Sequence, residues 1–398
     1  MKGLRWCVAL SLPLLQAAVA SNALAVDWGG YLRAGPGSTK KNASRACYGL
    51  NGPALKYRLG NECDIYGEFT LSQSMQKNDV DYKVKLMSYI WNGQTDSGDA
   101  RFGLQQMMIE MRGVDFAPQT NFWAGKRFYA RHDIHIVDQL ITDLGGVGAG
   151  FETPVLNGAM LGISYFKTDL PTPQTGMTSS ESGNRLSMEL AKVAVNQDGS
   201  LRFVSSLTKG NYHEGTSGFS FSAQHDQEKV FGGVNTLWLQ YAQGSAALTG
   251  NFGDLERTSR GRSFRIVDSV TWQVGALGGQ ALALWQSDRD PGVTTDSISV
   301  GGRVSYALTR NFKLVNELGY SQKRPDNGTG TQKLVKYTFA PVISPGPDFW
   351  SRPELRLYVT TAKWNQAANA AAGPNGLTGL GDNKTRGLSY GAQAEIWF

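Results

Sequence analysis

Apolar and polar residues alternate along much of this chain, and the alternation is clearest in its last segment, residues 386–398. Every second residue from Tyr390 to Phe398 is apolar or aromatic, whereas the residues between them include Gln393 and Glu395. A period of two predicts a β-strand with two different faces. The length of the run suits a tilted strand that crosses a lipid bilayer.

The same alternation recurs at the start of the chain, in residues 26–33, and again in residues 64–71 and 355–364. Because the first and last runs have matching patterns, they can pair and close the sheet, which removes its exposed edges. The pattern predicts many strands and no helices.

Clusters of Gly, Asn, Asp and Ser favour turns and loops. They separate the alternating runs at residues 92–93, 97–99, 145–150, 327–330 and 367–382. At about 20 residues for each strand with its connection, the chain after residue 25 holds roughly 16 to 18 strands. No segment has the composition of a linker, so residues 26–398 are predicted to form one domain.

Residues 1–25 have the organisation of a secretory signal peptide, with a basic start, an apolar stretch and an A-x-A cleavage motif at 23–25. A membrane-anchoring helix is disfavoured, because Pro13 and Gln16 interrupt the short apolar stretch. We therefore predict that residues 1–25 are cleaved and that the protein is exported.

No later apolar run approaches the length of a membrane-spanning helix. The exported chain is then either soluble in the periplasm or a closed barrel in the outer membrane, since a barrel satisfies its own backbone hydrogen bonds in lipid. Abundant glycine (48 residues), 11% aromatic residues and a negative mean hydropathy favour the barrel, although a soluble β-sandwich shares some of these features. Both termini are expected at the periplasmic rim.

Loss of Lys2, Arg5 and Cys7 with the signal peptide lowers the net charge from +6 to +4 and leaves Cys47 and Cys63. Two cysteines in an exported chain predict one disulfide bond. The mild positive charge, without large Lys/Arg clusters, argues against a nucleic-acid partner.

Two short motifs suggest other chemistry but are discounted. Residues 387–391 match the G-x-S-x-G pattern of hydrolases, yet Ser389 lies in a predicted strand rather than a strand-to-helix elbow. His132 and His135 fall on opposite faces of an extended segment, so a catalytic metal is not expected. We predict no cofactor and no enzyme activity; a loop calcium ion held by scattered aspartates remains an open alternative.

Several strings of the sequence resemble the maltoporins, the trimeric sugar-specific porins, and they extend from residue 26 to the last residue. The matching strings are VDWGGYLR (26–33), KYRLGNECDIYGE (56–68), WAGKRFYARHDIHIVD (123–138), FWSRP (349–353) and GAQAEIWF (391–398). The resemblance implies an all-β, 18-stranded transmembrane antiparallel barrel in the outer membrane. It also implies a homotrimer, an inward-folded third loop that narrows the pore, and a Cys47–Cys63 disulfide in the first extracellular loop.

By resemblance, the substrates are maltose and maltodextrins, which diffuse passively along a line of aromatic rings, the aromatic slide. Flat rings meet the apolar faces of sugars, and charged groups exchange hydrogen bonds with the hydroxyls. The matching slide residues are Tyr31, Tyr66, Trp350 and Trp397, with Trp91 as a candidate for a ring that a neighbouring subunit's loop supplies in the family. The matching charged track is Arg33, Arg58, Glu68, Arg131, Asp133 and Asp138.

The sequence departs from the family at two positions. Leu140 replaces a constricting Tyr, and about Val234 a slide Phe is missing, while Lys83 and Lys85 add positive charge on one strand face. These changes favour, as the alternative, a general-diffusion porin or a porin for a different sugar. An outer-membrane hydrolase is a third hypothesis, for which no triad can be placed.

Overall fold

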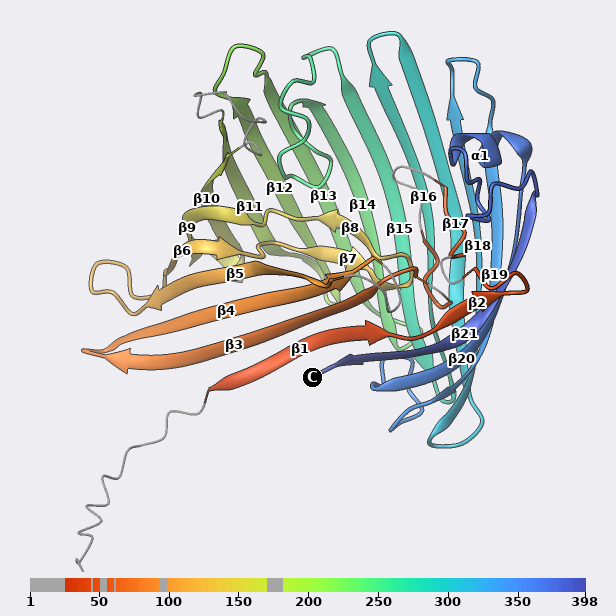
Figure 1. Cartoon of the computed structure of the whole chain (residues 1–398). Coiled ribbons are helices and arrows are strands. Elements are labelled where there is room, and N and C mark those ends of the chain that lie inside the picture. Colours follow the sequence, from red (N-terminus) through yellow and green to blue (C-terminus); the bar gives the residue numbers. More distant parts are fainter. Residues whose placement is uncertain (1–25, 44–45, 51–55, 61, 94–98, 170–181) are drawn as a thin grey trace, which may run out of the picture.

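The alternating residues form long antiparallel strands that wrap into one barrel (Figure 1). The structure is a computed structural model that describes residues 26–43, 46–50, 56–60, 62–93, 99–169 and 182–398. The predicted signal peptide, residues 1–25, lies outside the described residues. No described helix is long and apolar enough to cross a membrane.

The strands of the barrel wall are β1 (Asp27–Ala34), β2 (Gly37–Thr39), β3 (Ile65–Lys77), β4 (Val80–Asn92), β5 (Arg101–Arg112), β6 (Asn121–Arg127), β9 (Gly146–Pro154), β10 (Met160–Asp169), β11 (Ser182–Asn196), β12 (Gly199–Gly210), β13 (Ser217–Val230), β14 (Gly233–Gly244), β15 (Arg262–Val274), β16 (Leu277–Asp290), β17 (Val293–Ala307), β18 (Phe312–Pro325), β19 (Gln332–Ile343), β20 (Glu354–Trp364) and β21 (Arg386–Trp397). The short strands β1 and β2 both pair with β21, one after the other. The nineteen described segments therefore make an eighteen-stranded barrel.

The barrel closes between its first and last strands, as the sequence pattern predicted. β1 pairs with β21 on one side, where Tyr31 lies opposite Trp397, and with β3 on the other, where Tyr31 lies opposite Glu68. The C-terminus consequently lies beside β1 in Figure 1. Closure leaves this sheet with no free edge among the described strands.

Alternation along each strand separates a lipid-facing surface from the inside of the barrel. In β20, Leu357 is 64% exposed on the outside, whereas the neighbouring Arg356 is 2% exposed and points inward. Outward apolar and inward polar residues are the arrangement that a membrane barrel requires.

The third loop, residues 128–145, folds into the barrel instead of leaving it. It contains β7 (His132–Ile134), the 3-10 helix η1 (His135–Val137) and β8 (Gln139–Thr142), which lie inside the curved sheet in Figure 1. Its apolar side chains, including Ile136 and Ile141, pack against Trp238, Val267 and other residues of the inner wall. The predicted inward-folded third loop is thus present.

The first loop also turns inward and meets the third. The backbone N–H of Arg58 donates to the Ile136 carbonyl at 3.0 Å. The ring of Tyr57 lies against Gly301 and Gly319, where an added Cβ would come within 2.4 Å and 2.2 Å of the ring. Glycine at these two positions therefore lets the first loop lie directly on the barrel wall.

Two details of the sequence prediction were wrong. Residues 145–150 were expected to be a loop, but Gly146 begins strand β9; a Cβ at Gly148 would lie 2.2 Å from the Tyr165 carbonyl, so glycine there serves close strand approach rather than a turn. A helix was also not expected, yet α1 (Gln366–Ala371) forms between β20 and β21 with Asn365 as its N-cap, and a one-turn 3-10 helix, η2 (Leu156–Gly158), connects β9 to β10.

Candidate functional site

Strand register places the candidate slide and track residues of β1, β3, β4 and β21 on one inner face. Tyr31 lies opposite Trp397 and Glu68, and Arg33 lies opposite Tyr66. Directly opposed residues of antiparallel strands point to the same side of the sheet. The aromatic and charged residues therefore share the wall of the lumen.

Four of the predicted rings lie on this wall as two pairs, which are neighbours because Tyr31 lies opposite Trp397. The Trp350 and Trp397 ring centroids lie 6.2 Å apart, and those of Tyr31 and Tyr66 are also 6.2 Å apart. Trp350 belongs to the connection between β19 and β20 and is 42% exposed, while its neighbour Phe349 is buried against it at 4.9 Å. Buried Phe349 thus holds Trp350 at the edge of the lumen.

Two further rings pack against these pairs, and neither was among the predicted slide residues. Tyr89 of β4 stacks on Tyr66 with centroids 6.5 Å apart. His135 of the third loop lies edge-on to both Trp350 and Trp397, at 5.4 Å and 5.5 Å. Tyr89 lies opposite Glu68, so the period of two along β4 could have revealed it.

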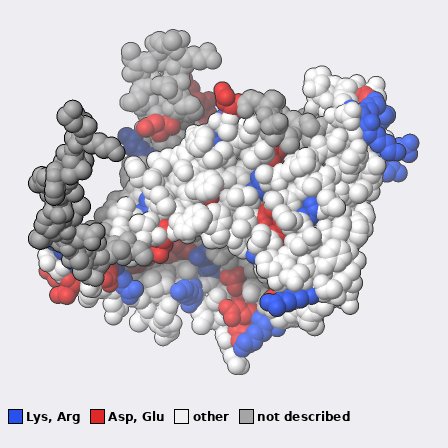
Figure 2. Space-filling view, turned by 60° about the horizontal axis from the view of Figure 1, so that its bottom comes forward, with Lys and Arg blue, Asp and Glu red and all other residues white. Residues whose placement is uncertain are grey.

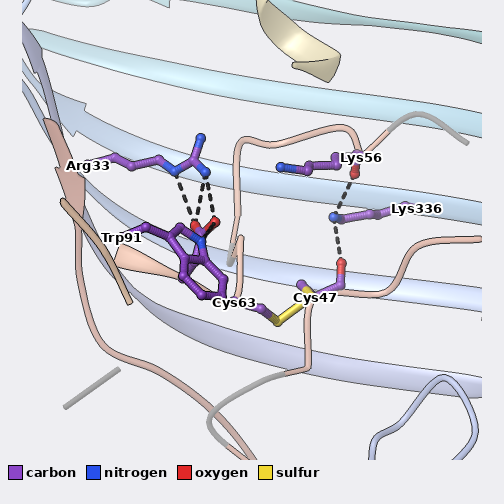
Figure 3. The surroundings of a disulfide bond; sticks show 7 residues. Arg33, Cys47, Lys56, Cys63, Trp91 and Lys336 are labelled. Atoms are coloured by element: carbon purple, nitrogen blue, oxygen red, sulfur yellow. Dashed lines mark hydrogen bonds and ion pairs between the residues drawn. A yellow bond between two sulfur atoms is a disulfide. The ribbon is translucent and has the colours of Figure 1, made fainter. Parts of the chain in front are cut away.

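Trp91 lies in β4 of its own barrel rather than in a loop, opposite Tyr66. Its indole N–H donates to Asp64 at 3.3 Å (Figure 3). Arg101 lies over its ring at 5.3 Å. It shares the inner face with the slide rings, at the end of β4 where the chain enters the second loop.

A cluster of charged side chains beside the rings is centred on Glu395, which alternates with Trp397 on β21 and was not among the predicted track residues. Tyr31 Oη donates to Glu395 at 2.9 Å, while Arg352 and Arg356 approach its other oxygen at 3.1 Å and 2.5 Å. Arg58 completes the group at 3.4 Å and also donates to Tyr31 Oη. Each of these contacts with Glu395 fixes a polar or charged side chain beside the slide rings.

Arg33 and Arg58 share a second set of carboxylates. The first loop and the inward-folded third loop, called the constriction loop from here on, contribute them. Arg33 pairs with Glu62 at 2.9 Å and with Asp64 at 3.0 Å (Figure 3), and Arg58 pairs with Glu62 at 3.0 Å. Asp138 lies 3.6 Å from Arg33 and 3.5 Å from Arg58. The structure thus brings three predicted track residues together.

The other predicted track residues lie nearby without joining this network of ion pairs. Tyr66 Oη donates to Glu68, which keeps that carboxylate beside the slide. Arg131 lies over Phe128 at 4.1 Å, and burial raises the pKa of Asp133. Although burial opposes ionisation, Arg58 and Lys56 hold the pKa of Asp138 below its usual value.

The disulfide predicted from the sequence is present in the first loop. Cys47 and Cys63 are bonded, and the buried Lys336 ammonium donates to the carbonyls of Cys47 at 2.7 Å and of Lys56 at 2.9 Å (Figure 3). These bonds position the segment that carries Arg58 and Glu62.

The two positions at which the sequence departs from the maltoporins, Leu140 and Val234, lie at different places along the lumen. Leu140 is half-buried in β8, opposite Asp133 of β7. Val234 lines a cavity of about 580 Å³ together with Trp350, Trp397 and other residues. The remaining lining residues are His132, Asp133, Ile134, His135, Thr236, Trp238, Ser269, Thr271 and Gln280.

The discounted motifs have structural explanations. His132 Nε2 contacts Arg202, whereas His135 lies among the slide rings, so the two histidines do not converge. No group of three or more potential metal ligands occurs among the described residues. Ser389 is buried within β21.

Comparisons with known proteins give one family match and several similar solved structures. A family model described as LamB porin matches residues 26–398. OccAB1 of Acinetobacter baumannii has a TM-score of 0.50 at 9% identity, covering 94% of this chain and 96% of that one. The channel DcaP of the same organism has a TM-score of 0.46 at 13% identity, covering 94% and 97%.

The anion-selective porin from Comamonas acidovorans has a TM-score of 0.46 at 10% identity, covering 94% of this chain and 99% of that one. At such identities the structural likeness concerns the fold alone. The family match spans far more than half of the chain and agrees with the eighteen-stranded barrel. This outer-membrane channel protein therefore belongs to the LamB porin family.

Proposed function

We propose that this channel carries sugars by passive facilitated diffusion, with maltose and maltodextrins as its substrates. The observation that supports this proposal is the two sets of rings, which meet where Tyr31 lies opposite Trp397, beside a strip of charged side chains on one wall. Rings contact the apolar sugar faces while charged groups exchange hydrogen bonds with hydroxyls. Weak repeated contacts permit conduction, whereas one tight site would stop it.

In this proposal Tyr31, Tyr66, Trp350 and Trp397 form the slide, and Trp91 receives the sugar at the second loop. The charged track consists of Arg33, Arg58, Glu68, Arg131, Asp133 and Asp138.

The proposal also includes cleavage of residues 1–25, a single barrel domain of residues 26–398, and a homotrimer. Mass spectrometry of the protein purified from membranes, under denaturing and native conditions, tests the cleavage and the trimer.

Planar-bilayer conductance tests the sugar function. Maltohexaose is expected to block the ion current at about millimolar or lower concentration, because it occupies the path that ions use. Trp397→Ala removes a ring contact of about 1 kcal/mol and should weaken the block about fivefold. Trp285→Ala is the matched control, because Trp285 is exposed on the outer wall. An unchanged block in Trp397→Ala would exclude the slide.

A second candidate function follows from Leu140 and Val234. Val234 lines a cavity of about 580 Å³ beside Trp350 and Trp397, and neutral polar groups form part of the lining. Such a space favours a bulkier sugar or less discrimination. Stronger block by sucrose than by maltohexaose indicates a different sugar, and the absence of block by any sugar indicates general diffusion.

A further inference from the structure

Two cations lie directly opposite each other on the outer face of the barrel. Lys363 of β20 pairs in register with Arg386 of β21, and both side chains are exposed. Ala362 and Trp364, which flank Lys363, are buried on the inner face. Lys363 and the directly opposed Arg386 therefore point outward. Like charges that are directly opposed on a sheet repel and destabilise it unless an anion compensates them.

No carboxylate among the described residues forms an ion pair with Lys363 or Arg386. Elsewhere on the same rim such compensation is present. Arg257 pairs with Asp290 at 2.7 Å, and Arg324 pairs with Asp296 at 2.8 Å. Arg262 of β15 and Arg289 of β16 also lie directly opposite each other and are exposed. The Lys363–Arg386 pair therefore differs from the rest of the rim in the further cations around it rather than in lacking a carboxylate partner.

Further cations surround this pair and create an excess of positive charge, which we call the rim patch. Its members are Lys40, Lys41, Lys333, Lys363, Lys384 and Arg386, and all are exposed. Asp382 is the carboxylate paired within it, with Lys41 at 3.3 Å and Lys384 at 3.6 Å. Lys40, Lys41, Lys384 and Arg386 line a cavity of about 410 Å³ that also contains exposed Leu380 and Leu388.

Figure 2 shows Lys and Arg gathered at the right edge of the molecule, the side on which β2, β20 and β21 lie in Figure 1, while most of the wall carries no charge. Below Lys363 and Arg386, the outward pairs continue as Thr361 with Leu388, Val359 with Tyr390, Leu357 with Ala392 and Leu355 with Ala394. The last two pairs line an apolar hollow of about 480 Å³.

The spacing between the patch and the hollow matches one lipid leaflet. Six residues separate Lys363 from Leu357, which is about 20 Å along a strand. A strand tilted by about 40° places the hollow about 15 Å below the patch. This depth is half of the roughly 30 Å hydrocarbon core.

We propose that the rim patch, with the apolar row and hollow below it, binds a phosphorylated glycolipid of the outer leaflet. The cations bind the phosphates of its headgroup, as basic pockets bind anionic lipids. An acyl chain lies along the outward pairs and ends in the hollow. This rim carries the long loops, which in outer-membrane barrels lie outside the cell.

The positive charge of the rim patch and the depth of the apolar hollow below it favour a lipid over a second subunit. A subunit would have to present several carboxylates at one edge of a membrane-embedded, apolar contact. A lipid with two phosphates supplies anionic charge at the rim and hydrocarbon below it in one molecule. The proposal concerns the outer surface and is independent of the sugar proposed for the lumen.

Native mass spectrometry of the detergent-solubilised protein tests the proposal with bisphosphorylated hexa-acyl lipid A as probe. Lys363→Gln with Arg386→Gln should bind this lipid about thirtyfold more weakly, since each cation near the headgroup contributes about one factor of five. The control Arg257→Gln with Arg324→Gln removes two rim cations that already have carboxylate partners, and should bind as the unchanged protein does. Channel conductance confirms that both variants fold.

Two comparison lipids distinguish the sources of the anion. Fully dephosphorylated lipid A should bind weakly, and phosphatidylglycerol should be retained less than the bisphosphorylated lipid. Equal retention of phosphatidylglycerol would overturn the assignment to a glycolipid. Unchanged lipid A affinity in the Lys363/Arg386 variant, or a change in its oligomeric state, would overturn the lipid site itself, the latter by identifying a subunit contact.

Discussion

Glu395 is 1% exposed and lies among three arginines on the lumen wall, at the point where the slide and the charged track meet. Its carboxylate orients the Tyr31 hydroxyl at 2.9 Å. A buried carboxylate in this position compensates charges that would otherwise repel one another. Glu395 therefore supports the proposed sugar path, although it was not among the charged-track residues that the maltoporin resemblance implied.

We predict that Glu395→Gln weakens maltohexaose block about tenfold and shifts the channel toward anions, because the arginines lose their shared counter-charge. Titration of the block and the reversal potential in a salt gradient measure the two effects. Glu152→Gln is the control, since Glu152 pairs with Arg127 at 3.4 Å away from the slide. Equal effects of both substitutions would contradict a specific role for Glu395.

The constriction loop contains two histidines that stay neutral at pH 7. Burial and nearby Arg202 lower the pKa of His132 to about 4, and burial also lowers that of His135. An unfolded histidine binds its proton near pH 6.5. Because the unfolded loop binds protons more readily, its folded arrangement loses stability as the pH falls from about 6.5 toward 4.

Single-channel current noise is therefore expected to rise between pH 7 and pH 4.5 as the loop loosens. His132→Gln cannot be protonated and should show a smaller rise. If the variant and the unchanged protein respond equally, His132 does not control the loop.

At the scale of elements, buried cations hold the inward loops to the wall. Arg265 donates to the Ile141 carbonyl at 3.0 Å, Lys336 holds the first loop, and Arg185 donates to the Leu144 carbonyl at 2.5 Å. None of the three forms an ion pair with a carboxylate among the described residues. Their N–H groups donate to loop carbonyls and neutral side chains instead.

Arg265→Met should release the constriction loop, because the Ile141 carbonyl loses a charged donor. Loss of such hydrogen bonds costs about 3 kcal/mol. We expect higher open-channel conductance and weaker maltohexaose block. Arg262→Met, an exposed position on the same strand, is the control. Unchanged conductance in Arg265→Met would show that other contacts hold the loop.

At the scale of the whole molecule, the terminal residue completes the closure of the barrel. Phe398 exchanges backbone hydrogen bonds with Gly30 at 2.9 Å and 3.1 Å, and its ring lies 4.7 Å from that of Trp28. Phe398→Ala should lower the temperature at which the folded form disappears on unheated-sample gels, because the ring pair contributes about 1 kcal/mol. Phe398→Trp keeps an aromatic ring at this position and should keep the temperature of the unchanged protein. Equal thermal behaviour of the two variants would contradict this role.

Much of the fold was predictable because alternation is a local property. The runs at 26–33, 64–71, 355–364 and 386–398 all became strands, and their outward faces are apolar. The errors arose where glycine served close packing, as at Gly148, rather than a turn. The short helix α1 was missed because its six residues lie in a loop, too short for a periodic signal.

The sequence by itself favoured the closed barrel and predicted the Cys47–Cys63 pairing, from period-two alternation and the cysteine count, while the family resemblance pointed to Tyr31, Tyr66 and Trp397. Only the tertiary structure decided that Glu395 gathers the arginines, that Tyr89 and His135 pack against the slide rings, and that Lys363 opposes Arg386 outside. The physical reason is register: alternation assigns a residue to a face, but which residues of distant strands and inward loops meet depends on how the strands are aligned and closed.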